Sequence, residues 1–266
     1  MATGVRVVLV SAGALLLAAG SARANSADCL AMASRSGPVQ MASYTPAALE
    51  QGQVQLTFIG HASFIIESPG GIRIVTDYAG NAGGIVPDVV TMNQAHSSHF
   101  TESPDSAIKH VLRGWNPEGG PAHHDVIVGD VRIRNVPTDL RGGMSGRREN
   151  GNSIFIFEVG DLCIGHLGHL HHSLGPEHLG MIGRLDIVLV PVDGGYTMAQ
   201  AEMLEVLKTL KTRLVIPMHY FGPATLARFV GTLDGSFEVE YASEPVRIVS
   251  SADLPEKPKL LVLPGY

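Results

Sequence analysis

Residues 162–174 read LCIGHLGHLHHSL, an apolar strand that runs directly into a histidine-rich loop. Four histidines fall within seven positions of that loop: His166, His169, His171 and His172. Packing seldom requires so many imidazoles together, whereas the neutral imidazole is the commonest metal-ligating side chain. The stretch therefore predicts a metal site where this strand ends.

The composition of the chain sets the broad class of protein. At 266 residues it is long enough for one large domain with a substantial core. Its formal net charge of −6 argues against a nucleic-acid-binding surface, which is normally basic. We therefore expect a globular protein that acts on a small molecule and binds no nucleic acid.

The N-terminus has the pattern of a secretory signal peptide over residues 1–24. A positive start is followed by an apolar run at 7–19 that is too short for a membrane span, and then by the A-x-A pattern of Ala22 to Ala24. Cleavage after Ala24 predicts a periplasmic or secreted protein with no transmembrane anchor. Residues 25–50 are interpreted as a tail, and residues 51–266 as one folded domain.

Two cysteines, Cys29 and Cys163, are present in the chain. Export permits a disulfide, and the sequence leaves open whether they pair or remain as two thiols.

Short apolar and alternating runs predict strands along most of the chain. Strands are expected at 53–58, 63–68, 72–76 and 88–92, with a helix near Ser103, a hairpin over 126–136 and a loop over 139–151. Further strands at 153–159, 162–164, 186–192 and 214–217 alternate with helices that begin near 176 and 199. Ile154 to Phe157 is apolar at every position, which indicates that both faces of that strand are covered. Two mixed β-sheets flanked by helices, an αββα sandwich, satisfy this pattern.

Five histidines lie at or just past the ends of predicted strands: His96, His99, His166, His169 and His219. They form two close pairs, each with a spacing of three residues, and one remote member. Tetrahedral metal sites commonly combine a close pair of ligands with one or two remote ones. These residues are therefore the candidate metal ligands.

Four motifs in order resemble those of the metallo-β-lactamase superfamily. They are TFIGHASF at 57–64, TD at 76–77, CIGHLG at 163–168 followed by PVDGG at 191–195, and VIPMHY at 215–220. Within that superfamily the chain looks like the branch of ascorbate-phosphate lactonases and of the phospholipase D that acts on N-acyl ethanolamine lipids. The resemblance covers residues 53–221 and implies a metallo-β-lactamase-like αββα sandwich.

The chain departs from the superfamily signature H-x-H-x-D-H, which falls on QAHSSH at 94–99. Gln94 replaces the first histidine and Ser98 the aspartate, while His169 stands where the family has an aspartate that bridges two metals. A carboxylate can touch two cations, whereas a neutral imidazole offers one lone pair. The resemblance with these departures implies one divalent metal, zinc, instead of two.

By the geometry of the family, the histidine ligands form two subsites on either side of His169: His96 with His166, and His99 with His219. Either pair together with His169 gives a three-histidine site with an open position, which suits a metal that acidifies water.

Other polar residues are candidates for supporting roles. His61 and Asp193 are candidates for proton handling or for hydrogen bonds to the ligands, and a structural role for His61 is the alternative. We expect Asp77 to hold the ligand loop through hydrogen bonds, and Gln94 to be a weak ligand through its carbonyl oxygen.

Arg141, Arg147 and Arg148 flank glycines in the loop expected at 139–151. They are candidates for binding an anionic part of the substrate, and the alternative is a solvated loop.

Two functions follow from these observations. The first is an exported metal-dependent hydrolase of an ester-like bond, such as a lactone or a phosphodiester. The second is a catalytically degenerate periplasmic protein that binds a metal or ligand without turnover. The retained histidines favour the first function, and the three altered ligand positions favour the second.

Overall fold

The computed structural model describes Met1 and residues 49–142 and 146–265. The predicted signal peptide beyond Met1, nearly all of the predicted tail and Cys29 lie outside these described residues. Among the helices of the described residues, none is long and apolar enough to cross a membrane.

The first sheet has six strands in the order β13-β1-β2-β3-β4-β5. Their bounds are β1 (Gln53–Gly60), β2 (Ser63–Glu67), β3 (Arg73–Val75), β4 (Val89–Met92), β5 (His110–Arg113) and β13 (Val246–Ser250). β13, β1, β2 and β3 pair antiparallel in turn, whereas β4 pairs in parallel with both β3 and β5. The first four predicted strands are confirmed.

The second sheet has eight strands in the order β12-β14-β11-β10-β9-β8-β7-β6. Their bounds are β6 (Asp125–Val128), β7 (Val131–Leu140), β8 (Arg148–Val159), β9 (Leu162–His166), β10 (Ile187–Pro191), β11 (Leu214–Met218), β12 (Glu238–Tyr241) and β14 (Lys259–Val262). β6 to β9 form an antiparallel meander, and β9, β10, β11, β14 and β12 pair in parallel. Both sheets are therefore mixed, as predicted.

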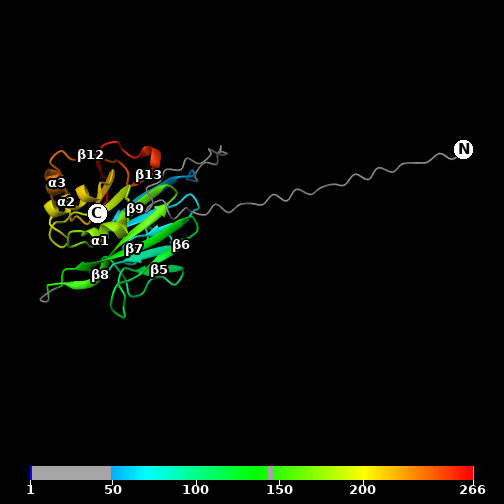
Figure 1. Ribbon diagram of the computed structural model, residues 1–266, viewed down its shortest axis with the longest axis horizontal. Helices are drawn as coiled ribbons and strands as arrows, with labels where there is room; N and C mark the ends of the chain where they lie inside the picture. The colour runs from blue at the N-terminus through cyan, green and yellow to red at the C-terminus, as the bar shows by residue number, and fades with distance from the viewer. Residues whose placement is uncertain (2–48, 143–145, 266) are drawn as a thin grey trace.

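Three α-helices connect parallel strands of the second sheet, and Figure 1 shows them grouped on one side of the molecule. α1 (Pro176–Ile182) leads from β9 to β10, α2 (Gln200–Leu210) from β10 to β11, and α3 (Pro223–Thr232) from β11 to β12. A proline lies in the first turn of α1 and of α3. The N–H groups of a first turn have no partner within the helix, so proline, which lacks an N–H, costs no hydrogen bond there. A short 3₁₀ helix, η1 (Ser251–Asp253), follows β13.

The main core fills the space between the two sheets. Its largest fully buried side chains come from both, with Phe64 on β2 and Phe155 and Phe157 on β8. Because side chains alternate along a strand, Ile65 points to the other face of the first sheet. There it packs on a smaller cluster that includes Trp115 and is formed partly by loop residues. The predicted αββα class is confirmed.

Two local predictions are wrong. No helix forms near Ser103, because Asp105 accepts the main-chain N–H groups of Ala107 and Ile108 in a local turn that leads into β5 instead. The loop predicted over 139–151 is shorter, because β7 continues to Leu140 and β8 begins at Arg148, which pairs with it after a register shift.

Cys163 lies on β9, is fully buried and is disulfide-bonded, so the alternative of a free thiol is wrong for this residue.

Candidate metal centre

The sequence-predicted polar side chains gather where strands of both sheets end. His61 lies in the turn between β1 and β2, Asp77 follows β3, and His96 and His99 follow β4. From the second sheet, His169 follows β9, Asp193 follows β10, and His219 follows β11. The two sheets hold the strands in place, and the strands fix the ends of the loops that carry these groups. A rigid scaffold can position metal ligands at such loop ends.

Four histidines form one compact group, which we call the histidine group: His61, His96, His99 and His219. Each offers one ring nitrogen, and these nitrogens all lie within 4.8 Å of one another. Tetrahedral zinc with N–Zn bonds of about 2.1 Å needs nitrogens about 3.4 Å apart, so small ring rotations would close the group around an ion. The donor set thus fits one transition metal.

The two fully buried members of the group, His99 and His219, face each other. Their Nε2 atoms are 3.0 Å apart. Nδ1 of His99 lies 2.6 Å from Asp77 Oδ2, and Nδ1 of His219 lies 3.0 Å from Asp193 Oδ1. An ionised carboxylate only accepts hydrogen bonds, so His99 carries its proton on Nδ1 and directs its Nε2 lone pair inward. Nδ1 of His219 is close to Asp193 but makes no hydrogen bond of acceptable geometry with it, so that contact is electrostatic. Carboxylate–histidine pairs of this kind orient metal ligands.

Asp77 is ionised although it is completely buried. Burial alone would raise its pKa, but His99 and His166 nearby, and hydrogen bonds from His99 and Asn93, hold the pKa below its ordinary value. The amide of Asn93 donates to Oδ1 at 2.9 Å. Asp77 therefore holds the loop that carries His99, as the sequence led us to expect.

Asp193 is held by the loop that follows β10. Its carboxylate accepts the main-chain N–H groups of Gly195 and Tyr196 at 2.8 and 2.5 Å, and the hydroxyl of Thr197 at 2.5 Å. Burial opposes ionisation, but the adjacent His219 and the hydrogen bonds from Thr197 and Gly195 lower the pKa of Asp193 well below its ordinary value. Asp193 is thus a fixed anion that lies 3.0 Å from Nδ1 of His219.

His61 adopts a left-handed backbone, with φ of 52°. Its carbonyl oxygen accepts the N–H of His219 at 2.6 Å, which ties the β1–β2 turn to the end of β11. Its Nε2 is buried and has no hydrogen-bond partner among the described residues. Burial, and then the proximity of His219, lowers the pKa of His61 to about 3. A neutral ring with an open lone pair suits a metal ligand better than a proton acceptor.

His96 and His169 meet at the edge of the group, with their Nε2 atoms 3.1 Å apart. The hydroxyl of Ser98, at the position of the family's aspartate, lies 2.7 Å from Nδ1 of His96. Burial lowers the pKa of His96 to about 4 and also lowers that of His169. On its other side, Nδ1 of His169 lies 2.8 Å from Nε2 of His171. Gln94 lies in the same loop after β4, where its main-chain N–H donates to the carbonyl of Gly151 at 3.1 Å.

His166 points away from the histidine group. It is fully buried, its Nε2 donates to the carbonyl of Ala62 at 2.8 Å, and its Nδ1 accepts the N–H of Gly168 at 3.1 Å. Both ring nitrogens therefore have partners within the protein, which leaves neither lone pair facing the other histidines.

Sequence reasoning missed two buried asparagines that support this region. Asn93 joins Asp77 to the N–H of Ser153, and Asn152 accepts the N–H of His169 at 2.7 Å. Both lie against Gly168, which has φ of +59° and where an added Cβ would come within 2.4 Å of each side chain. In the sequence, the position of these two asparagines beside the ends of apolar strands was the only feature that could have indicated their role.

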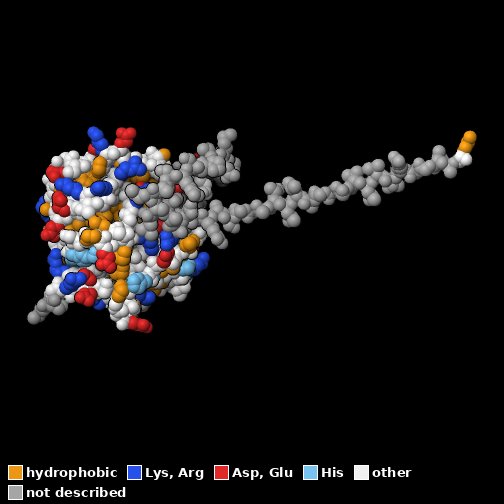
Figure 2. Space-filling view, viewed as in Figure 1, with side chains coloured by type: hydrophobic (Ala, Val, Ile, Leu, Met, Phe, Trp, Pro, Cys, Tyr) orange, Lys and Arg blue, Asp and Glu red, His pale blue; other side chains and the backbone are white. Residues whose placement is uncertain are grey.

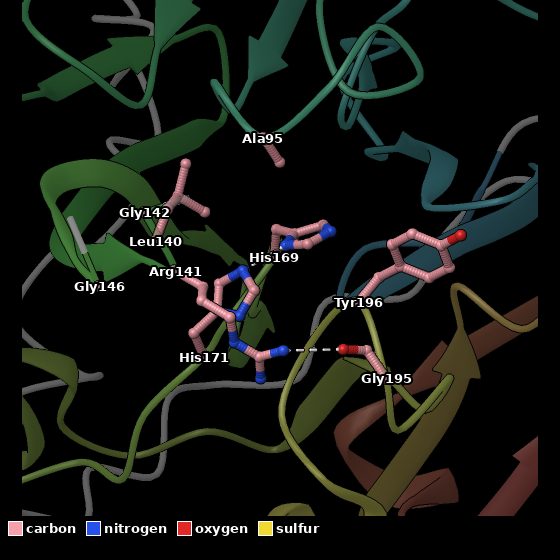
Figure 3. A pocket seen from close by; sticks show the side chains of 9 residues that line it. All are labelled: Ala95, Leu140, Arg141, Gly142, Gly146, His169, His171, Gly195 and Tyr196. Carbon is pink, nitrogen blue, oxygen red and sulfur yellow. Dashed lines mark hydrogen bonds between the residues drawn. The ribbon is translucent and has the colours of Figure 1, made fainter. Parts of the chain in front are cut away.

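A cavity of about 610 Å³ opens beside the histidine group (Figure 3). His169 lines it, together with Ala95, Leu140, Arg141, His171 and Tyr196. Of the three arginines predicted to bind substrate, only Arg141 lines this cavity. Arg147 is largely exposed and pairs with Asp139, and Arg148 lines neither this cavity nor the adjoining one of about 450 Å³.

Comparison with known proteins gives concordant results. The sequence model described as the β-lactamase superfamily domain matches residues 55–219. A UPF0173 metal-dependent hydrolase of Pelotomaculum thermopropionicum is 28% identical over 193 residues, covering 63% of this chain and 84% of that protein. A homologue from Pyrococcus abyssi with the same description is 27% identical over 195 residues, which cover 63% and 84% of the two chains.

Solved structures show the same fold. A Thermotoga maritima protein assigned to the metallo-β-lactamase superfamily matches with a TM-score of 0.57 and 28% identity, covering 79% of this chain and 98% of that one. Igni18, a metallo hydrolase from Ignicoccus hospitalis, matches in fold with a TM-score of 0.52 and 20% identity, covering 80% and 97%.

Proposed function

Because the chain belongs to the β-lactamase superfamily, we propose that it is a metal-dependent hydrolase whose metal is held by the histidine group. The relatives described as metal-dependent hydrolases support this reaction class. The observation that carries the proposal is the convergence of four imidazoles, two of them beside buried carboxylates. A bound divalent metal would polarise the scissile bond and acidify water there.

The charges around the group favour a single metal ion. The four grouped side chains are imidazoles, and Asp77 and Asp193 supply two negative charges directly behind them. Two carboxylates balance one dication and leave a second one uncompensated, which is costly in a buried site. We propose one divalent ion, zinc, because imidazole nitrogen in a tetrahedral arrangement is a common zinc environment.

The protein's own residues have separate roles in this proposal. Asp77 keeps the proton of His99 on Nδ1, so that Nε2 of His99 stays available, and Asp193 places a negative charge beside Nδ1 of His219. His61, with its unpartnered Nε2, supplies the fourth nitrogen. His169 lies between the group and the cavity, where it would contact a substrate that reaches the centre.

We also propose an ester-like substrate, a lactone or phosphodiester of small-molecule size, and export directed by residues 1–24. The cavity volume of about 610 Å³ is within the range of small-molecule sites. The resemblance of the four motifs to the lactonase and phospholipase branch supports the reaction class, and the signal-peptide pattern supports a periplasmic or secreted location.

One observation favours a second function, a metal-binding protein without turnover. No carboxylate belongs to the group of four, and His61 completes a tetrahedral set, whereas catalytic zinc sites keep a position open. A hydrolase of this design must accept substrate as an additional ligand or displace one imidazole.

Metal content and hydrolysis together test the proposal. Zinc-loaded protein should hydrolyse members of a panel of aryl esters, lactones and phosphodiesters, and His96→Ala and His219→Ala should abolish turnover. His123→Ala, a change outside the group of four and the 610 Å³ cavity, is the matched control. Metal binding at one ion per chain without hydrolysis of any panel member would instead establish the second function.

A further inference from the structure

We propose that Arg141 forms an oxyanion-binding subsite in the cavity beside the histidine group. On the basis of the proposed function, the substrate then carries an anionic arm, a carboxylate or a phosphate, at one end and its hydrolysable bond at the other.

Arg141 is fixed across the cavity by the loop that follows β10. Its guanidinium donates from Nη1 to the carbonyl of Gly195 at 3.0 Å and from Nη2 to the carbonyl of Thr197 at 3.3 Å. Figure 3 shows the side chain reaching toward Gly195 past His171. A guanidinium has five N–H groups, so these two bonds leave three for a ligand. The same loop directs its N–H groups to Asp193, so Arg141 is positioned by the segment that holds Asp193 beside His219.

The charge of Arg141 is not neutralised by the contacts that hold it. Three other arginines in or beside the second sheet pair with carboxylates: Arg132 with Asp125, Arg134 with Glu158, and Arg147 with Asp139. Arg141 instead contacts main-chain carbonyls within the described residues. An arginine fork without a carboxylate partner is suited to bidentate binding of an oxyanion.

Two exposed aromatic rings flank the route from this subsite to the histidine group. Tyr196 lines the cavity and is 65% exposed, and its ring centroid lies 5.4 Å from that of Phe221, which is 60% exposed. Phe221 in turn lies 5.8 Å from His61 and 5.5 Å from His219. Exposed apolar side chains that adjoin one another mark ligand or partner sites, whereas single scattered ones need no explanation. We assign them to the apolar or planar body of the same substrate.

The test measures binding of small probes to the full chain after metal removal by a chelator, so that no anion can bind through a metal. The probes are benzoate, phenyl phosphate and benzamide, and calorimetry gives each dissociation constant. Benzoate or phenyl phosphate should bind about tenfold more tightly than the neutral benzamide, because charge-assisted hydrogen bonds are the stronger ones. The better of the two anions identifies the arm as carboxylate or phosphate.

Variants assign the effect to Arg141. In Arg141→Gln the anion and benzamide should bind with about equal dissociation constants, so that the preference is lost. Arg141→Lys should retain part of the preference through charge alone. Arg148→Gln removes the same charge from the neighbouring strand outside the cavity and should leave the preference intact. Near-ultraviolet circular dichroism verifies the fold of each variant.

Three results would overturn the subsite: no preference for either anion in the wild type, a preference that survives Arg141→Gln, or an equal loss in Arg148→Gln. The metal has been removed, so the proposed hydrolysis cannot act on the probes, and a failure of the proposed hydrolase activity would leave this result unaffected.

Discussion

His99 and His219 direct their Nε2 atoms at each other over 3.0 Å, and a separate buried aspartate lies beside each Nδ1, 2.6 Å away for His99 and 3.0 Å away for His219. His99 donates its Nδ1 proton to Asp77, so its Nε2 offers a lone pair, which in the metal-free protein accepts a proton from Nε2 of His219. A cation bound there would replace that proton and would be attracted by both aspartates. The pair therefore explains why the folded protein should gain stability from a metal.

Metal removal is the first prediction. Adding zinc to chelator-treated protein at about 100 times its dissociation constant should stabilise the fold by about 2.7 kcal/mol. At about 2–4 °C per kcal/mol for a domain of this size, the midpoint of thermal unfolding should rise by about 5–10 °C. Calorimetry and elemental analysis measure the midpoint and the stoichiometry. A content of two metals per chain would contradict the charge argument.

The carboxylates beside the histidine group supply the second prediction. Asp193→Asn should weaken zinc binding by about 10–100-fold, because the amide removes the negative charge that lies 3.0 Å from Nδ1 of His219. Competition with a chromophoric chelator measures the affinity. Asp130→Asn is the control and should leave zinc affinity unaltered. It changes a carboxylate that accepts a hydrogen bond from Ser68, outside the histidine group. Equal affinities in both variants would remove the role assigned to Asp193.

His166 and His219 should separate stability from metal binding. His166→Ala leaves the Ala62 carbonyl and the Gly168 N–H without this partner, so it should lower the free energy of unfolding by about 1–3 kcal/mol. Its zinc affinity should stay at the wild-type value, whereas His219→Ala should lower zinc affinity about tenfold or more. Urea denaturation and chelator competition provide the two readings. Loss of zinc from His166→Ala that refolds normally would return His166 to the ligand set.

Acid should destabilise the metal-free protein. The pKa values of His61, His96 and His171 are lowered from 6.5 to about 3, 4 and 4, with burial the largest cause for each. As the pH falls below 6.5, the unfolded chain binds protons at these residues and the folded chain does not. Stability is therefore complete above pH 6.5 and declines as the pH falls toward 4.

Urea denaturation of chelator-treated protein between pH 7 and pH 5 tests this dependence, since few carboxylates titrate in that window. His171→Gln should make the decline shallower, because one of the three histidines is removed. A free energy of unfolding that stays constant over the window would show that the folded and unfolded chains bind protons equally, so that the pKa values of these rings are not lowered by folding.

The sequence by itself determined the layers of the fold and the end of the strands at which the site lies. Apolar runs such as Ile154 to Phe157 required cover on both faces, and histidines at strand ends indicated a metal. It could not locate β5, because the local turn at Asp105 resembles the start of a helix. It also gave no reason to select Asn93 or Asn152, since a buried asparagine is recognised by its partners.

Only the tertiary structure decided which histidines meet. His166 and His169 are three residues apart, yet His166 turns to the carbonyl of Ala62 on the opposite sheet, and His169 turns to His96. His61 joins the group through a left-handed turn whose carbonyl is bonded to the N–H of His219, 158 positions later in the chain. The direction of an imidazole depends on backbone dihedrals and on partners from the other sheet, and local sequence encodes neither.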